Sequence, residues 1–361
     1  MTAERGNGTN DAPDVLILRL DGGERFVHSR RSPEPPMIMS CSRREFLVKS
    51  GSCAAHVALA GALMPNVLRA AWARSPIGEI VGREPFGSLE RLADGVWALV
   101  SNPLGGDRTT ISNGGLIAGK TGVLAIEGFN QPQGALWLAN KARELTGRWP
   151  THVALTHYHA DHANGVAGYL EGGAQPQVRA TQRTRELVLE RNMPADTSRT
   201  NALQQTVFID GDAPSTLDLG GRVVRVVPRL GHTESDVSIE LDDPSIVFCG
   251  DLFWNAMFPN YVDALPIQLG QAARALRRPS DTLYVPGHGA LGRQAAYDRY
   301  VTMLDEVERA ARAGHAKGAS ATEAAASFSL PQSLGEWTLF SKAFYERAFT
   351  AWYRDLAAKP S

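Results

Sequence analysis

Short apolar runs bounded by glycine, proline and acidic residues recur along the chain from residue 95 onward. Runs of this length are typical of β-strands, and the turn residues between them mark where each strand ends. A Gly-Lys-Thr-Gly turn at 119–122 and a Gly-Gly pair at 220–221 interrupt two of the runs and predict hairpins. The expected strand regions are 95–100, 115–128, 152–156, 217–230, 237–241, 245–249 and 283–285.

Longer stretches between the strands have the spacing of amphipathic helices. In residues 293–313 the apolar stripe consists of Tyr300, Met303, Leu304 and Val307. Helices are also expected over 133–145, 182–191 and 336–357, and the aromatic side chains of the last one favour a core face over a partner surface. Strands and helices mix throughout without a repeat of fixed period, which predicts an α/β layered domain.

The segment before this domain has the three parts of an export signal. It contains Ser-Arg-Arg-Glu-Phe-Leu-Val-Lys at 42–49, a moderately apolar stretch at 54–65, and a small-residue cleavage site, Ala-Trp-Ala, at 71–73. This order is typical of a signal peptide, and the paired arginines indicate the twin-arginine route. We therefore expect the twin-arginine export machinery to be a partner and the product to be periplasmic or secreted.

The signal begins unusually late, because residues 1–38 are polar and become proline-rich toward their end. Met37 and Met39 lie just upstream of the arginines, and we expect translation to start at one of them. Residues 1–73 are then an N-terminal extension plus signal peptide, and residues 74–361 form one domain with C-terminal helices. Polar residues precede Cys53, which argues against a lipoprotein site, so no stable membrane anchor is expected.

The composition mainly excludes classes of protein. With 43% hydrophobic and 21% charged residues, the balance is that of an ordinary globular protein. Basic and acidic residues number 37 and 38, and the net charge of −1 gives no electrostatic footprint for nucleic acid. The three cysteines, Cys41, Cys53 and Cys249, exclude a disulfide scaffold and a cysteine-rich zinc module. No apolar run reaches the roughly 20 residues that span a bilayer.

Candidate chemistry is concentrated directly after the strand at 152–156. His157-Tyr158-His159-Ala160-Asp161-His162 places three imidazoles and a carboxylate within six residues. Neutral imidazole is the commonest protein ligand for metals, and carboxylate oxygens complete such sites. A loop that leaves a strand end can direct His157 and His159 toward one point and Asp161 and His162 toward a second point nearby.

Three further candidates follow the same pattern, each at an expected strand end and each directly after a glycine. They are His232 in Gly-His-Thr, Asp251 in Gly-Asp-Leu and His288 in Pro-Gly-His-Gly. Glycine lets the chain turn sharply and lets backbone approach a crowded site. Each of these motifs by itself is weak evidence for a metal site. The indication comes from the concentration of histidines in residues 157–162 and these three motifs together.

The composite pattern resembles the metallo-β-lactamase superfamily over roughly residues 85–314. The resemblance implies an α/β fold, a four-layer αββα sandwich with two metals at one sheet edge. It also implies that His157, His159 and His232 bind the first metal, that Asp161, His162 and His288 bind the second, and that Asp251 bridges them. All seven positions hold the expected residue type.

Histidine and carboxylate ligands without thiolate suit two Zn²⁺ ions per chain, with iron or manganese as alternatives. Two neighbouring cations lower the pKa of water enough to supply hydroxide at neutral pH, and they polarise a carbonyl. Asp161 is in addition a candidate catalytic residue, which steers the hydroxide and accepts a proton. We therefore expect an exported metal-dependent hydrolase that cleaves an ester, amide or lactam bond of a small molecule.

Two kinds of alternative stay open. Export favours a β-lactamase proper over a glutathione thioesterase, and a mononuclear iron dioxygenase or a non-catalytic relay module on the same scaffold remain competing classes. Around the site, Cys249 is interpreted as an apolar strand residue and Tyr158 as a packing residue rather than an oxyanion donor. Residues 102–107 are a candidate flap. The aromatic residues after Asp251 either wall a substrate pocket or pack a loop; they are Trp254, Met257, Phe258 and Tyr261.

Overall fold

The computed structural model describes residues 76–358, except 193, 194, 205, 210, 212 and 342, together with two short antiparallel strands, β1 (Arg19–Leu20) and β2 (Gly23–Glu24). The chain divides into two compact units, Met1–Leu63 and Met64–Ser361. The expected export signal, both candidate start methionines, Cys41 and Cys53 lie outside the described residues. Within the described ranges, no helix combines the length and apolar character that a membrane span requires.

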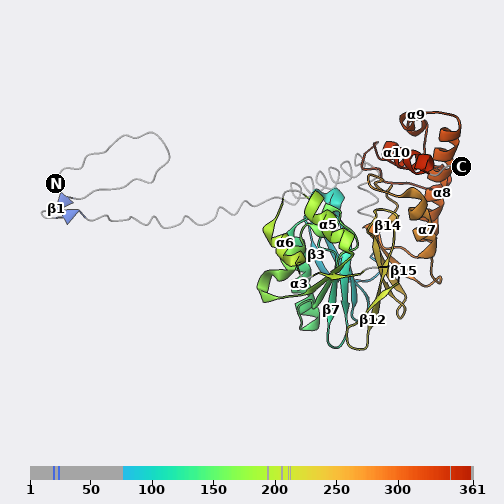
Figure 1. Cartoon of the computed structure of the whole chain (residues 1–361). Helices are drawn as coiled ribbons and strands as arrows, with labels where there is room; N and C mark the ends of the chain where they lie inside the picture. Colours follow the sequence, from blue (N-terminus) through green and yellow to red (C-terminus); the bar gives the residue numbers. More distant parts are fainter. Residues whose placement is uncertain are drawn as a thin grey trace, which may run out of the picture. The chain divides into compact units, whose positions relative to one another are not determined.

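Thirteen strands of the described part of the second unit form two sheets (Figure 1). The first sheet has the order β10-β9-β8-β7-β6-β5-β4-β3 and the second has the order β11-β12-β13-β14-β15. Pairing is antiparallel from β3 to β7 and from β11 to β14, and parallel from β7 to β10 and between β14 and β15. The strands of the first sheet are β3 (Glu79–Glu84), β4 (Gly87–Ala93), β5 (Val96–Ser101), β6 (Gly114–Ala118), β7 (Val123–Ile126), β8 (His152–Ala154), β9 (Gln177–Ala180) and β10 (Val207–Phe208). Those of the second are β11 (Ser215–Asp218), β12 (Val223–Pro228), β13 (Val237–Leu241), β14 (Ile246–Asn255) and β15 (Leu283–Gly289).

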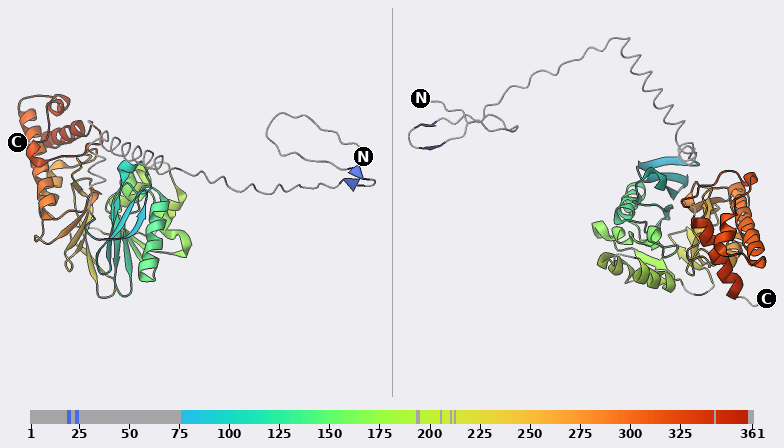
Figure 2. Two further views of the ribbon diagram at one scale, coloured as in Figure 1. Left: turned by 180° about the vertical axis from the view of Figure 1, so that it is seen from behind. Right: turned by 90° about the horizontal axis from the view of Figure 1, so that it is seen from above.

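Helices cover the outer face of each sheet, which makes four layers in the order α, β, β, α (Figures 1 and 2). The first sheet packs against α3 (Pro132–Thr146), α5 (Gln182–Arg191) and α6 (Thr197–Leu203). The second packs against α7 (Pro266–Ala275), α8 (Gln294–Ala316), α9 (Ala321–Ala326) and α10 (Ala343–Ala358). The remaining helical turns are α4 (Ala160–Ala163), η1 (Pro103–Gly105), η2 (Val166–Gly173) and η3 (Gln332–Leu334). The architecture confirms the expected αββα sandwich.

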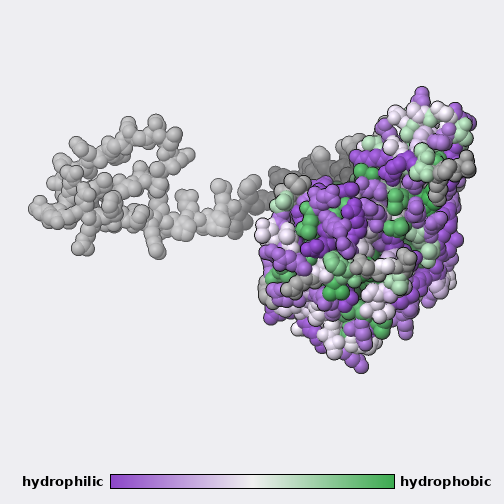
Figure 3. Space-filling model, viewed as in Figure 1, coloured by the Kyte–Doolittle hydropathy of each residue, from purple (hydrophilic) through white to green (hydrophobic). Residues whose placement is uncertain are grey.

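Alternation of side chains within single strands explains the layers. In β5, Val96 and Ala98 belong to the core between the two sheets, whereas Trp97 and Leu99 belong to the core between the first sheet and its helices. Successive side chains of a strand point to opposite faces, so a strand buried on both faces is apolar without interruption. Hydrophilic side chains dominate the face of the molecule in Figure 3, with apolar ones in small separate groups.

Most expected elements are confirmed, including both hairpins and the helices over 133–145, 182–191 and 293–313. The expected helix start at residue 336 is wrong, because α10 begins at Ala343. The reason is a contact with the loop after β14: the N–H of Thr338 donates to the carbonyl of Ala256 at 2.9 Å, and its carbonyl accepts from Phe258 at 2.9 Å. These bonds hold the backbone of Thr338 in an extended pairing instead of a helix.

The strand expected to end at Cys249 is also longer than predicted, because β14 continues to Asn255. Its pairing with β15 shifts register between Phe248 and Gly250 and again between Gly250 and Trp254. Asp251 and His288 therefore lie inside paired strands and not in the turns after them. Such irregularities redirect side chains at the edge of a site.

Candidate metal centre

Four of the candidate ligands come from the short segment between β8 and η2. His157 and His159 follow the last residue of β8 by three and five positions, and Asp161 and His162 belong to the single-turn helix α4. His159 precedes α4 with φ −55° and ψ 149°, outside helical geometry, so the chain changes direction there before the helical turn that carries Asp161 and His162. The segment is held in place by the bond from the Gly128 N–H to the carbonyl of His162 at 2.7 Å.

The other three candidates come from the second sheet. His232 follows β12, Asp251 lies in β14 and His288 lies in β15. The glycine before each one is a packing requirement, and it is clearest at Gly287. A Cβ atom there would lie 1.9 Å from Oδ1 of Asp251, a distance at which neither atom can remain in place. Gly287 therefore makes room for the carboxylate of Asp251.

The first group consists of His157, His159, His232 and Asp251, whose candidate ligand atoms lie within 4.8 Å of one another. Nδ1 of His159 is 3.1 Å from Nε2 of His157 and 3.0 Å from Nε2 of His232. Nε2 of His232 is 3.1 Å from Oδ2 of Asp251. Three imidazole nitrogens and one carboxylate oxygen thus converge on one point.

The second group consists of Asp161, His162 and His288. Nε2 of His288 is 3.3 Å from Oδ2 of Asp161 and 3.4 Å from Oδ1 of Asp251, and Nε2 of His162 is 3.2 Å from the same Oδ1. Asp251 consequently faces the second group with Oδ1 and the first group with Oδ2. The structure brings all seven candidates together, with Asp251 between the two groups.

Carboxylates hold the far side of two of the imidazole rings. Glu127, which directly follows β7, places Oε1 at 3.0 Å from Nδ1 of His162 and accepts from the Thr156 hydroxyl at 2.6 Å. Asp263 places Oδ2 at 3.1 Å from Nε2 of His159 and accepts a bond from the hydroxyl of Tyr158. A carboxylate behind an imidazole fixes its tautomer and raises its basicity as a ligand.

The electrostatics of the cluster favour positive charge at its centre. Burial by itself would raise the pKa of Asp251, but the neighbouring imidazoles of His288, His162 and His232 outweigh it and hold that pKa well below its ordinary value. Burial would likewise lower the pKa of His288, yet the carboxylates of Asp251 and Asp161 raise it to about 9. The carboxylates are therefore ionised, and their negative charge favours a cation at the centre, either a proton on His288 or a metal ion that replaces it.

The donor set fits two metal ions. Among the described residues, Nε2 of His162 and Oδ1 of Asp251 are buried and make no well-oriented hydrogen bond, although they lie 3.2 Å apart. Leaving such atoms unpaired costs free energy, and a cation between the groups would satisfy both. Imidazole and carboxylate donors in two adjacent sets match dinuclear sites of zinc or of a similar divalent ion.

The structure resolves several interpretations of neighbouring residues. Cys249 is buried among apolar side chains, and burial raises the pKa of its thiol well above the ordinary value, which confirms the interpretation as an apolar strand residue. The ring centroids of Trp254 and His288 are 4.0 Å apart. Trp254 therefore forms part of the wall of the metal centre. The hydroxyl of Tyr158 is engaged by Asp263 and its ring packs edge-on against His159. Residues 103–105 form η1, and the mobility of this flap stays a prediction.

Sequence reasoning missed Glu127 and Asp263. A signal for Glu127 was present, because it is a single carboxylate directly after the apolar run 123–126 and has to be buried there. Its positive φ of 77° is a further sign of a constrained position that only the structure reveals. Asp263 lies in a loop more than 100 residues from His159, and nothing local distinguishes it from other aspartates.

Residues 109–288 match the model of the metallo-β-lactamase superfamily. Over 200 residues the chain is 28% identical to a hydroxyacylglutathione hydrolase of Acidiphilium cryptum, which covers 55% of this chain and 73% of that protein. A hydroxyacylglutathione hydrolase of Parasynechococcus marenigrum is also 28% identical, over 39% of this chain and 50% of its own length. The chain thus spans between half and three quarters of the length of these curated relatives.

Solved structures with the same architecture include a metallo-β-lactamase from Erythrobacter litoralis, with a TM-score of 0.52 and 20% identity over 63% of this chain and 100% of that one. A stereoselective inverting secondary-alkylsulfatase from a Pseudomonas species has a TM-score of 0.59 and 17% identity over 74% of this chain and 50% of its own. At this level of identity the likeness demonstrates the fold alone.

Proposed function

Because residues 109–288 form a metallo-β-lactamase superfamily domain, we propose that the chain is a dinuclear metal-dependent hydrolase that carries two Zn²⁺ ions. The observation that carries this proposal is the position of Asp251, whose two oxygens face two separate groups of imidazoles. His157, His159 and His232 would hold the first ion, and Asp161, His162 and His288 the second, with Asp251 between them. Such ions supply a water nucleophile at neutral pH and polarise the bond under attack.

The two aspartates of the site differ in exposure, and this difference assigns them different roles. Asp251 is only 3% exposed and holds the centre together, whereas Asp161 is 23% exposed and is the carboxylate that substrate and water can reach. Asp161 would thus orient the attacking water and accept its proton through the carboxylate oxygen that does not face His162 and His288. Trp254 shields His288 from water on one side. Glu127 and Asp263 keep the rings of His162 and His159 in the orientation that metal binding requires.

The bond that is cleaved is an acyl bond, and an ester or thioester is the first candidate. The name of the relatives, hydroxyacylglutathione hydrolase, describes hydrolysis of an acylglutathione, which is a thioester, and it supports this class for a chain that resembles the first of them over 55% of its length. Amide and lactam bonds follow, because the same attack on a carbonyl cleaves them. The expected substrate is a small molecule.

We also propose that the domain acts outside the cytoplasm. The proposal rests on the twin arginines at 43–44 and the small-residue site at 71–73, which would direct the chain through the twin-arginine machinery into the periplasm or medium. Substrates that occur only in the cytoplasm, glutathione thioesters among them, are less suited to such a location. Fractionation of the native host should place the mature protein outside the cytoplasm, and the double variant Arg43→Lys with Arg44→Lys should remain inside.

A substrate panel tests the activity. Purified zinc-loaded protein is assayed with aryl esters, a thioester, a lactone and a chromogenic cephalosporin, with and without chelator. We expect chelator-sensitive turnover of at least one ester or thioester. His159→Ala should abolish it and reduce the zinc content, because it removes a nitrogen that lies near both His157 and His232.

The matched control is His315→Ala, which changes an exposed histidine of α8 and should retain zinc and activity. Turnover by His159→Ala at full zinc content would contradict the proposed site. Isolation of the native protein with one iron per chain would contradict the dinuclear zinc assignment and favour the dioxygenase class.

A further inference from the structure

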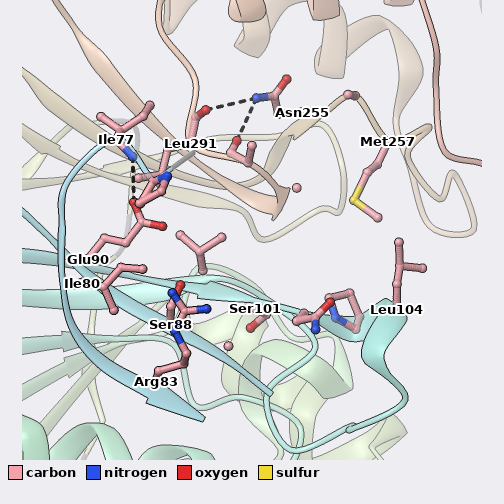
Figure 4. Close-up of a pocket in the computed structure, with 18 of the residues that line it drawn as sticks. Ile77, Ile80, Arg83, Ser88, Glu90, Ser101, Leu104, Asn255, Met257 and Leu291 are labelled. Atoms are coloured by element: carbon pink, nitrogen blue, oxygen red, sulfur yellow. Dashed lines mark hydrogen bonds between the residues drawn. The ribbon is translucent and has the colours of Figure 1, made fainter. Parts of the chain in front are cut away.

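A cavity of about 660 Å³ lies beside the metal centre; we call it the side cavity. One wall comes from β3, β4, the end of β5 and the loop after it, and the facing wall comes from the ends of β14 and β15 and the residues that follow them. Figure 4 shows Leu104 of the first wall opposite Met257 of the second, across open space. The volume is that of a site for a small organic molecule. None of the seven candidate metal ligands lines it, so it is a binding space of its own.

The side cavity borders the metal centre through single residues. Its lining residue Gly289 directly follows His288, and Nδ2 of Asn113 donates to the carbonyl of Gly289 at 2.9 Å. On the opposite wall, the hydroxyl of Ser101 donates to the carbonyl of Ser112, whose own hydroxyl donates to the carbonyl of Asp161 at 2.6 Å. A peptide bond on one wall and a chain of hydrogen bonds on the other therefore connect the side cavity to two candidate ligands, His288 and Asp161.

The greater part of the lining is apolar, and each of its two carboxylates accepts a hydrogen bond from a neutral donor. The apolar side chains are Ile77, Ile80, Val100, Leu104, Met257 and Leu291. Oε1 of Glu84 accepts from Nε1 of Trp137 at 2.9 Å, and Oε2 of Glu90 accepts from the N–H of Ile77 at 3.1 Å. The amide of Asn255 donates to the carbonyls of Ala290 and Leu291 (Figure 4). This lining suits the apolar body of a ligand.

Two guanidinium groups of the lining have no anionic partner among the described residues: Arg83 on β3 and Arg299 on α8. Arg299 is half-buried, and its guanidinium lies 5.4 Å from the centroid of the Trp337 ring, which restricts its position. A half-buried arginine that is held in place but not paired is a ready donor for an anion, because its fork of N–H groups matches a carboxylate.

We propose that the side cavity binds the remote part of the substrate, an apolar body that ends in a carboxylate or a similar anionic group held by Arg299, with Arg83 as the second guanidinium of the lining. This inference rests on the proposed function and specifies its substrate class: an ester or thioester whose far end is an organic acid. The energy of binding this remote end would be available to position the scissile bond at the metal centre.

Direct binding tests the inference independently of turnover. The affinities of 4-phenylbutyrate and of its neutral amide, 4-phenylbutyramide, are measured by titration calorimetry with the zinc-loaded and the metal-free protein. We expect tighter binding of the carboxylate in both forms. Arg299→Met should weaken the carboxylate about tenfold and leave the amide unchanged, and Arg299→Lys should recover part of the loss. The control is Arg309→Met, at an exposed arginine of the same helix that pairs with Glu306.

Each outcome decides the inference. Equal affinity for the acid and the amide, no binding of either, or an unchanged acid affinity in Arg299→Met would overturn it. A preference that disappears when the metal is removed would also overturn it, because the carboxylate would then be bound to the metal ions. If Arg299→Met does not fold, Arg83→Met, at an exposed position, replaces it. Intact binding together with no hydrolysis of any ester or thioester would retain the side cavity and refute the proposed function.

Discussion

At the scale of single residues, the metal centre depends on space as much as on ligand type. A glycine precedes His232, Asp251 and His288, and Gly250 has the positive φ of 52° that L side chains rarely adopt. Two carboxylates that do not face the centre support it from behind. A substitution that fills the space beside a ligand, or that removes a carboxylate behind an imidazole, should therefore reduce metal binding although every ligand is still present.

The Gly287→Ala variant tests the requirement for space. The added methyl group would lie 1.9 Å from Oδ1 of Asp251, so the carboxylate must move away from His162 and His288. We expect the loss of at least one zinc ion per chain and a fall of activity by more than about 100-fold. Elemental analysis and turnover are the measurements, with Gly270→Ala as the control, because its Cβ would meet only the flexible end of Arg274. Full zinc occupancy in Gly287→Ala would refute this account.

The Asp263→Asn variant tests the support behind His159. The amide can no longer act as a charged acceptor for Nε2 of His159, so the ring loses its fixed orientation. We expect the zinc affinity to fall by about 10–100-fold, measured by competition with a chromogenic chelator, while the metal-free protein unfolds as the wild type does. Asp281→Asn, at an exposed position before β15, is the control. An unchanged affinity would show that His159 is held by other contacts.

At the scale of elements, strand β13 carries a buried charge that its neighbours neutralise. Glu240 is 1% exposed and accepts bonds from Arg229 at 2.8 Å, from Arg225 at 3.2 Å, and from Arg278. It also accepts from the Ser238 hydroxyl at 2.7 Å. The carboxylate thereby ties β12 and β13 to the segment after α7. A charge this buried is tolerated only with such partners.

Glu240 should make the stability of the second sheet depend on pH. Burial would raise the pKa of its carboxyl, but the Ser238 hydroxyl and the guanidinium groups of Arg229 and Arg278 outweigh it and lower the pKa below the ordinary 4.5. The ionised form therefore stabilises the fold above about pH 4.5, and this contribution is lost as the pH falls through the lower pKa of the folded state.

The measurement is urea unfolding of the wild type and of Glu240→Gln at several pH values. We expect the variant to be less stable by about 3–5 kcal/mol at pH 7, and the difference should shrink below about pH 4.5. A conservative change at a carboxylate that is 30% exposed, Glu308→Gln on α8, should show neither effect beyond the loss of its surface ion pair with Arg312. A constant difference between Glu240→Gln and the wild type across the whole range would contradict the assignment.

At the scale of the whole molecule, the candidate metal centre joins the two sheets. His157, His159, Asp161 and His162 extend from the first sheet, and His232, Asp251 and His288 belong to the second. The contacts on the ring sides away from the centre also cross between segments far apart in the sequence, as between Asp263 and His159. Bound metal should consequently stabilise the contact between the two halves of the sandwich.

Metal removal tests this coupling. Chelation should lower the unfolding temperature by roughly 10 °C, because ions that bind only the folded state contribute a few kcal/mol to its stability. Added zinc should restore the original value, whereas His159→Ala should respond weakly to both treatments. Differential scanning calorimetry provides the measurement. Equal unfolding temperatures with and without chelator would show that the sheets are held together without the ions.

The sequence alone determined the elements and the chemistry of the candidate site. Uninterrupted apolar runs predict the strands that β5 and β7 form, and His157 to His162 with the three glycine-preceded residues name every candidate ligand. Periodicity and side-chain type are local properties, so they can be read without a structure. The wrongly predicted helix start at residue 336 shows the limit of such local prediction, because a hydrogen bond between Thr338 and Ala256 determines the backbone there.

Only the tertiary structure decided how distant segments meet. It showed which oxygen of Asp251 faces each group, placed Asp263 behind His159 across a separation of 104 residues, and brought Arg83 and Arg299 to one cavity. None of these contacts leaves a local pattern, because each depends on how two sheets and their helices pack as a whole. The physical reason is that secondary structure follows from neighbouring residues, whereas a site follows from the closure of the entire fold.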